Sequence, residues 1–146
     1  MVLVSACLLG QPCRYDGRDN RSETLAAVLA GRAVVPICPE AGAGLGTPRP
    51  PVQLCGGDGD AVLDGRAHAR EVESGADRTA AFVEGARLAV EAAQRHGATC
   101  AVLKARSPSC GTSECWQDGA RRPGPGVASA ALKRAGVAVL SDEQLG

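Results

Sequence analysis

The segment DRTAAFVEGARLAVEAAQRHGATCAVLK, residues 77–104, joins the clearest helix of this chain to an apolar strand. Its apolar side chains recur at helical spacing, and Gly97 is typical of a helix end. The run at 98–104 is short, apolar and β-branched, which predicts a buried strand. The helical stripe consists of Phe82, Val83, Ala86, Ala89, Val90 and Ala93.

Similar pieces lie on both sides of this segment. Apolar runs predict three more strands, and two further helices are expected, the first of them after a capping Ser22. The Pro- and Gly-rich stretch 39–51 excludes regular structure and is interpreted as an active-site loop. Residues 52–70 are interpreted as a hairpin or irregular excursion at an edge, and residues 105–126 as a polar loop. The predicted strands are 2–6, 33–38 and 137–141, and the predicted helices are 23–31 and 126–136.

Strands that alternate with helices are typical of parallel βαβ units. The sequence therefore predicts an α/β fold, namely a three-layer α/β/α Rossmann-like arrangement with a mostly parallel sheet. A length of 146 residues is that of one domain, so residues 1–146 are expected to form a single unit.

Charge and hydropathy exclude several classes of protein. Lys and Arg number 16, as do Asp and Glu, so the formal net charge of zero lacks the footprint of a general nucleic-acid or membrane-surface binder. No apolar run approaches the ~20 residues of a membrane span, and the N-terminus has no cationic start. We expect a cytoplasmic protein that binds neither a membrane nor a nucleic-acid duplex, and the sequence leaves its oligomeric state open.

Seven cysteines are the main chemical feature of the chain. Cys7 and Cys38 follow predicted strands directly, and Cys110 lies in the loop after a third strand. Because ligands of parallel sheets bind beyond the carboxyl ends of the strands, these three thiols are expected to converge there. Cys55, Cys100 and Cys115 are interpreted as structural, since free cysteine is usually buried.

The residue types around these thiols favour iron over zinc. Zinc sites show paired CxxC units or Cys/His spacing, but the chain has neither, and His68 and His96 are isolated. An all-thiolate site favours an iron–sulfur cluster. Three ligands would leave one iron with an open position for a substrate atom. Cys13 could be a fourth ligand, a wall of the pocket or a nearby non-ligating thiol.

Polar residues beside the cysteines supply candidate acid–base and binding groups. Glu40, two residues after Cys38, is the candidate general base, because partial burial would raise its pKa toward neutrality. Asp16 and the serines could equally stabilise their own turns. The other candidate donors and acceptors are Asp16, Lys104, Ser107 and Ser109, and the candidate anion-binding residues are Arg14, Arg49 and Arg106.

Five motifs occur in order along the chain and together resemble the thiouracil desulfidase family, also called domain of unknown function 523. They are VSACLLG (4–10), CRYDG (13–17), CPEAGAGLGTPRPP (38–51), GADRTAAFVEGA (75–86) and LKARSPSCG (103–111). The resemblance implies a [4Fe-4S] cluster held by three cysteines. It also implies a non-redox reaction in which water replaces the sulfur of a thiolated pyrimidine and hydrosulfide leaves.

Carried over motif by motif, the resemblance makes Cys7, Cys38 and Cys110 the metal ligands. Cys13 also stands in a family motif, so which three of the four bind the cluster stays open, and Cys13 is otherwise a catalytic candidate. Glu40 becomes the acid–base residue and Ser107 its polar helper. The family implies thiouracil or 4-thiouridine monophosphate as the small-molecule substrate. The run GAGLGTPRP departs from the bulkier residues expected there, which affects the shape of the pocket.

Two other classes of function remain open at the level of the sequence. One is a metal-free enzyme in which Cys7 or Cys110 acts as a nucleophile, although no CxxC motif or histidine partner supports it. The other is a sensor module in which the cluster only reports oxygen or iron.

Overall fold

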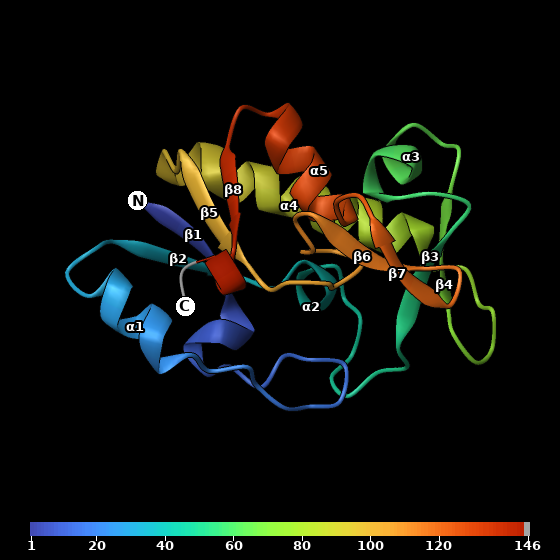
Figure 1. The fold of residues 1–146 in the computed structure, drawn as a ribbon, viewed down its shortest axis with the longest axis horizontal. Helices are drawn as coiled ribbons and strands as arrows, with labels where there is room; N and C mark the ends of the chain where they lie inside the picture. The colour runs from blue at the N-terminus through green and yellow to red at the C-terminus, as the bar shows by residue number, and fades with distance from the viewer. Residues whose placement is uncertain (145–146) are drawn as a thin grey trace.

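The computed structural model describes residues 1–144 and contains two four-stranded sheets (Figure 1). All neighbouring strands of the first sheet are parallel, in the order β2-β1-β5-β8, which confirms the predicted parallel sheet. Its strands are β1 (Val2–Ser5), β2 (Val34–Ile37), β5 (Cys100–Leu103) and β8 (Ala138–Ser141).

Helices cover both faces of the parallel sheet, because successive side chains of a strand point to opposite faces. Leu3, Ala101 and Leu103 pack in one cluster with α4 and α5, whereas Val2 and Val4 pack in the other with α1. Figure 1 shows α1 on one side of the sheet and α4 with α5 on the other. The three-layer α/β/α prediction is confirmed. These helices are α1 (Glu23–Leu29), α4 (Thr79–His96) and α5 (Val127–Arg134).

The helix ends follow the local signals of the sequence. The hydroxyl of Ser22 accepts a hydrogen bond from the Leu25 amide at 3.1 Å, which caps α1 as expected. Gly97 ends α4 in the left-handed conformation, with φ of 65°. Within residues 1–144, no helix combines the length and the apolar character needed to cross a membrane.

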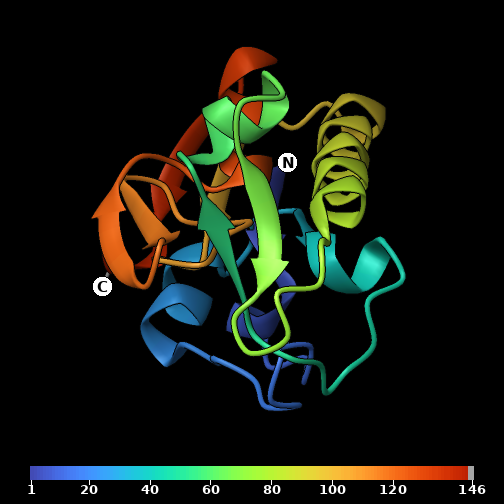
Figure 2. The same cartoon turned by 90° about the vertical axis from the view of Figure 1, so that its right-hand side faces the viewer.

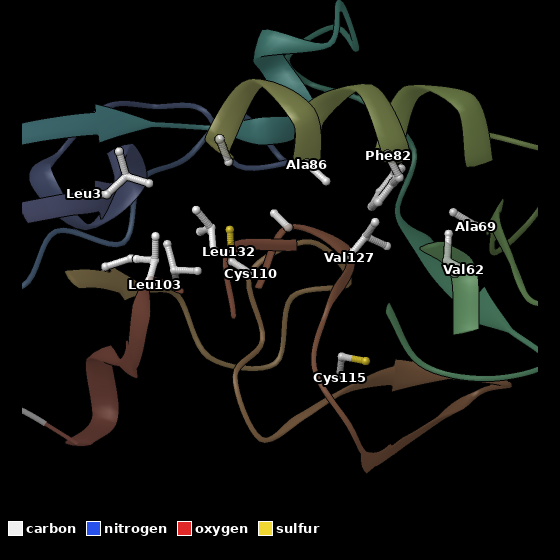
Figure 3. Close-up of a cluster of buried hydrophobic side chains, with 14 of the residues drawn as sticks. Leu3, Val62, Ala69, Phe82, Ala86, Leu103, Cys110, Cys115, Val127 and Leu132 are labelled. Atoms are coloured by element: carbon white, nitrogen blue, oxygen red, sulfur yellow. The ribbon is translucent and has the colours of Figure 1, made fainter. Parts of the chain in front are cut away.

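The larger core cluster connects α4 to the loop that carries Cys110. In Figure 3, Phe82 and Ala86 of α4 point toward Val127 and Leu132 of α5, and Cys110 lies in the same cluster. Phe82 is 2% exposed and Cys110 is 6% exposed. The packing of two helices therefore holds one of the candidate ligands in place.

The predicted excursion over 52–70 belongs to the second sheet and not to an edge of the first. Its two strands pair antiparallel, as expected for a hairpin, and α3 lies between them along the chain. In Figure 2 the two strands face the viewer and run in opposite directions. The elements are β3 (Val52–Cys55), α3 (Gly59–Leu63) and β4 (His68–Glu71).

The prediction of a polar loop over 105–126 is wrong in part. This segment contains an antiparallel hairpin of β6 (Glu114–Gln117) and β7 (Ala120–Pro123). β6 also pairs parallel with β3 through Leu54 and Gln117, which completes the order β4-β3-β6-β7. Asp118 and Gly119 form the turn with φ values of 49° and 83°. An Asp-Gly pair with two positive φ angles is typical of a tight hairpin, so this signal could have predicted it.

The stretch 39–51 was expected to lack regular structure, but the one-turn helix α2 (Pro39–Gly42) stands at its start. Cys38 is the extended residue before the helix, and Pro39 occupies its first turn. Proline favours this position because its φ suits a helix and its missing N–H has no partner there anyway. The proline that suggested a loop therefore starts the turn that carries Glu40.

We predict that Gly85→Ala displaces α2 from α4. A Cβ at position 85 would lie 2.4 Å from the Pro39 carbonyl oxygen, so one of the two helices must move. We expect a loss of about 1–3 kcal/mol in the free energy of unfolding, measured by urea denaturation. Gly42→Ala is the matched control, since its Cβ meets only the Leu88 side chain at 3.6 Å. Equal stability of both variants would contradict this close packing.

Candidate metal centre

A cavity of about 700 Å³ opens at the carboxyl ends of β1, β2 and β5. The residues that line it include four cysteines from different parts of the chain: Cys7, Cys13, Cys38 and Cys110. None of the seven cysteines forms a disulfide, and the other three do not line this cavity. The structure therefore brings the predicted thiols together, and their role as ligands stays a prediction.

Cys7 lies just beyond β1, in the short 3-10 helix η1 (Ala6–Leu9). The loop after it folds back, and the Asn20 amide nitrogen donates a 2.8 Å hydrogen bond to the Cys7 carbonyl. The Asn20 side chain also donates to the Cys7 sulfur at 3.5 Å. Asn20 therefore orients the first thiol through both its backbone and its side chain.

Cys38 directly follows β2 and precedes α2. Its thiol donates to the Cys13 carbonyl at 3.7 Å, which places the loop of Cys13 beside the end of β2. Cys13 is only partly buried and belongs to neither a helix nor a strand. Its position thus depends on contacts with the other segments around the cavity.

Cys110 is held by a turn that docks on α5. The Ser107 hydroxyl oxygen accepts hydrogen bonds from the amides of Ser109 and Cys110, both at 3.1 Å. The carbonyls of Pro108 and Ser109 in turn accept from Val127 and Ala128 at 2.9 Å. The turn thereby satisfies donors at the start of α5, which has no side-chain cap.

Gly111 closes the same turn tightly. A Cβ at this position would lie 2.3 Å from the Glu114 carbonyl oxygen and 2.8 Å from that of Ser107. Only glycine avoids both backbone clashes, which explains the last residue of the SPSCG motif in physical terms.

Burial raises the pKa of the Cys7 and Cys110 thiols, and burial together with nearby Cys38 raises the pKa of Cys13 to about 12. These thiols therefore favour the protonated form until a metal takes the place of the proton. A metal-free nucleophile needs the opposite, a lowered thiol pKa. The environment of Cys7 and Cys110 thus argues against the cysteine-nucleophile alternative.

The cavity thiols do not form a site for a single metal ion. Across the described residues, no three His, Cys, Asp or Glu side chains come close enough to hold one. In an iron–sulfur cluster each thiolate binds a different iron atom, so the sulfur atoms stand further apart. Several unpaired thiols around one roomy cavity fit a cluster better than an isolated ion.

Glu40 lies in the cavity wall beside these thiols. Its side chain is 16% exposed, and its Oε1 lies 3.5 Å from Nε of Arg49, whose side chain is 7% exposed. Burial raises the pKa of the Glu40 carboxyl, and the positive charge of Arg49 opposes this effect. A buried carboxylate whose pKa is raised in this way is suited to accept a proton.

Four further predicted residues line the cavity: Arg14, Lys104, Arg106 and Ser107. Arg106 forms an ion pair with Glu143. Lys104 Nζ lies 3.5 Å from Asp142, and Arg14 donates to the side chain of Asn20 at 2.9 Å. Because the Ser107 oxygen accepts two backbone hydrogen bonds, its own O–H remains free to donate.

Two residues predicted to bind substrate do not line the cavity. Asp16 accepts from the Arg18 amide at 3.0 Å and pairs with Arg14 at 3.1 Å, so its turn and its neighbour occupy it. Ser109 is 2% exposed and packs beneath the Cys110 turn. The outcome for Asp16 follows the turn-stabilising alternative, whereas the Ser109 hydroxyl is buried without a hydrogen bond to any described residue.

Sequence reasoning missed several residues of the cavity wall: Ser5, Tyr15, Asn20 and Trp116. Ser5 stands two residues before Cys7 and accepts from the Lys104 amide at 3.0 Å. Trp116 and Tyr15, the two exposed aromatic residues, each have an arginine guanidinium 6.0 Å from the ring centre. The Asp-Gly turn of the hairpin is the one signal that could have pointed to Trp116.

The parallel sheet, with cysteines gathered beyond the ends of three adjacent strands, defines an α/β protein with a candidate cluster site. The chain belongs to the 2-thiouracil desulfurase family, whose model matches residues 2–144.

Two relatives align with almost all of the chain. YbbK, an uncharacterized protein of Bacillus subtilis (strain 168), is 38% identical over 99% of this chain and 97% of its own length. The solved structure of TudS, a [4Fe-4S]-dependent thiouracil desulfidase, superimposes with a TM-score of 0.83. It is 40% identical, and the match covers 99% of this chain and 91% of TudS.

Proposed function

We propose that this protein is a [4Fe-4S]-dependent desulfidase that replaces the sulfur of a thiolated pyrimidine with oxygen from water. The convergence of Cys7, Cys38 and Cys110 on one cavity beside a buried Glu40 carries this proposal. The family of the chain and the likeness to TudS support it. Thiouracil and 4-thiouridine monophosphate are the candidate substrates, and the free thiols suit the reducing cytoplasm.

Cys7, Cys38 and Cys110 are the proposed ligands, because each stands beyond the end of one of three adjacent strands. Cys13 comes instead from an irregular loop, and we assign it to the wall of the cavity, where it can contact the substrate. When bound, a cluster with three protein ligands supplies one iron with an open position, which is a Lewis acid for the soft sulfur of a thiocarbonyl group.

The residues of the chain supply the remaining chemistry. Glu40 accepts a proton from water as the oxygen attacks the ring carbon, so a C–O bond forms while the C–S bond breaks. Ser107 donates its O–H to the substrate, and Arg14 and Lys104 orient polar groups of the ring or of its substituent. The sulfur leaves as hydrosulfide, and no electrons are gained or lost overall.

Anaerobic preparation with iron and sulfide tests the function directly. We expect the protein to bind about four iron and four acid-labile sulfide atoms per chain. We also expect it to release hydrosulfide from 2-thiouracil or 4-thiouridine monophosphate. A bound cluster without hydrosulfide release from either compound would favour the sensor function. Release of hydrosulfide by metal-free protein would favour the cysteine-nucleophile enzyme. Either result would overturn the proposal.

A further inference from the structure

We infer that Arg49 is a positioning residue that fixes Glu40 and the loop of Cys13 relative to each other at the cavity. This inference rests on the proposed function for the role of Glu40. A positioning role takes the place of the substrate-binding role that the sequence favoured for Arg49. The contacts of the buried Arg49 guanidinium group support this inference.

Arg49 connects three separate segments. Its Nη2 donates to the Cys13 carbonyl at 2.9 Å, and its Nη1 donates to the Gly46 carbonyl and the Thr47 hydroxyl, both at 3.1 Å. Its Nε lies 3.5 Å from the Glu40 carboxylate. In addition, its backbone amide donates to the Tyr15 carbonyl at 2.6 Å. One residue thus joins α2, the loop before β3 and the loop that follows η1.

These contacts occupy most of the donors of the side chain. An arginine has five N–H groups, and it binds a carboxylate or phosphate best with two parallel ones. Both N–H groups of Nη1 and one of Nη2 are used by protein oxygens, and Nε faces Glu40. Counting the oxygens of residues 1–144, a single N–H of Nη2 is left, which is too few for a two-pronged grip on a substrate anion.

Arg49 is more deeply buried than Arg14, another cation that lines the cavity. The Arg49 side chain is 7% exposed, whereas that of Arg14 is 32% exposed. Arg49 Nε is also buried without a hydrogen bond to any described residue, which leaves the Glu40 carboxylate as its nearest countercharge. Burying a cation costs free energy unless it is paired, so Arg49 depends on these protein partners rather than on solvent.

The geometry has a direct consequence for the reaction. The loop over residues 10–20 has no helix or strand, and the carbonyls of Cys13 and Tyr15 are its contacts with Arg49. Cys13 and Glu40 both line the cavity. When Arg49 is lost, Glu40 and the loop of Cys13 can shift relative to each other, and a misplacement of about 1 Å can cost about 100-fold in rate.

The test compares Arg49→Lys and Arg49→Ala with Arg78→Lys in the cluster-loaded protein. Arg78 pairs with the buried Glu71 at a distance of 2.7 Å, and neither residue lines the cavity of the cysteines. The pair borders the loop of Arg49 from the other side, so Arg78→Lys controls for the loss of an Arg–Glu pair close to that loop. For both Arg49 variants we expect kcat to fall about 100-fold with little change in KM and full iron content. Arg78→Lys should keep both kinetic constants. An increase in KM at unchanged kcat, or loss of the iron, would overturn the inference.

A second measurement does not depend on activity. In cluster-free protein, the amides of residues 10–20 should exchange hydrogen faster in Arg49→Lys than in the parent protein or in Arg78→Lys. Unchanged exchange of these amides would contradict the positioning role of Arg49 even if the variant is inactive. Conversely, faster exchange in a protein that releases no hydrosulfide would support the positioning role of Arg49 and contradict the proposed function.

Discussion

Replacing Cys110 by serine should abolish cluster binding and, with it, hydrosulfide release. The thiol is 6% exposed and lies in a turn that is fixed on α5, so no other side chain can take its place without movement of the core. A hydroxyl is a poor ligand for iron in place of a soft thiolate. We expect iron and acid-labile sulfide to fall to background in the reconstituted variant, with activity lost in parallel.

Two further variants make this result specific. Cys55→Ser should keep the full iron content, because Cys55 is partly buried and does not line the cavity. Cys13→Ser should also keep the iron if Cys7, Cys38 and Cys110 are the ligands. If Cys13→Ser loses the cluster while Cys110→Ser retains it, the ligand set is Cys7, Cys13 and Cys38, and the assignment by strand ends is wrong.

Glu40→Gln should lower kcat by about 10²–10⁴-fold while the cluster remains bound. Glutamine has nearly the same shape as glutamate but cannot take a proton from water. Iron analysis and kcat for thiouracil on the same sample measure the effect, and a melting curve shows whether the now unpaired Arg49 destabilises the fold. The expected pattern, a loaded but slow enzyme, differs from that of a ligand variant.

The matched control for Glu40 is Glu91→Gln on the outer face of α4. Glu91 pairs with Arg87 and Arg95 at 2.9 Å and 2.6 Å, and these side chains are exposed. Its loss should change neither iron content nor kcat. Full activity in Glu40→Gln would show that another group accepts the proton.

Several features of the fold were predictable because their signals are local. The stripe that contains Phe82, Ala86 and Ala89 predicted α4, and its last turn ends at the glycine that the sequence marked. The apolar strands placed Cys7 and Cys38 at the carboxyl ends of neighbouring strands. For parallel strands, this placement is enough to predict that distant thiols meet at one edge of the sheet.

Other features depend on pairing between distant segments, and the Asp118-Gly119 turn is the local signal that one of them offers. The hairpin β6–β7 is polar, and its pairing with β3 joins Leu54 to Gln117, residues far apart in the chain. A strand of this kind is stabilised by its partner and not by its own composition. The prediction of a polar loop failed for this reason, and with it the position of Trp116 at the cavity was missed.

The sequence by itself determined the strands and flanking helices of the parallel sheet and the convergence of the cysteines, because hydrophobic periodicity and strand ends are properties of short segments. The tertiary structure alone decided how the polar side chains are used. Arginine is a residue type that commonly binds anions, yet the donors of Arg49 face oxygens of its own loop, of the loop over residues 10–20 and of Glu40 in α2, which only folding brings together. Hydrogen bonds are short and directional, so their partners follow from the packed positions of the backbone and not from the spacing of residues along it.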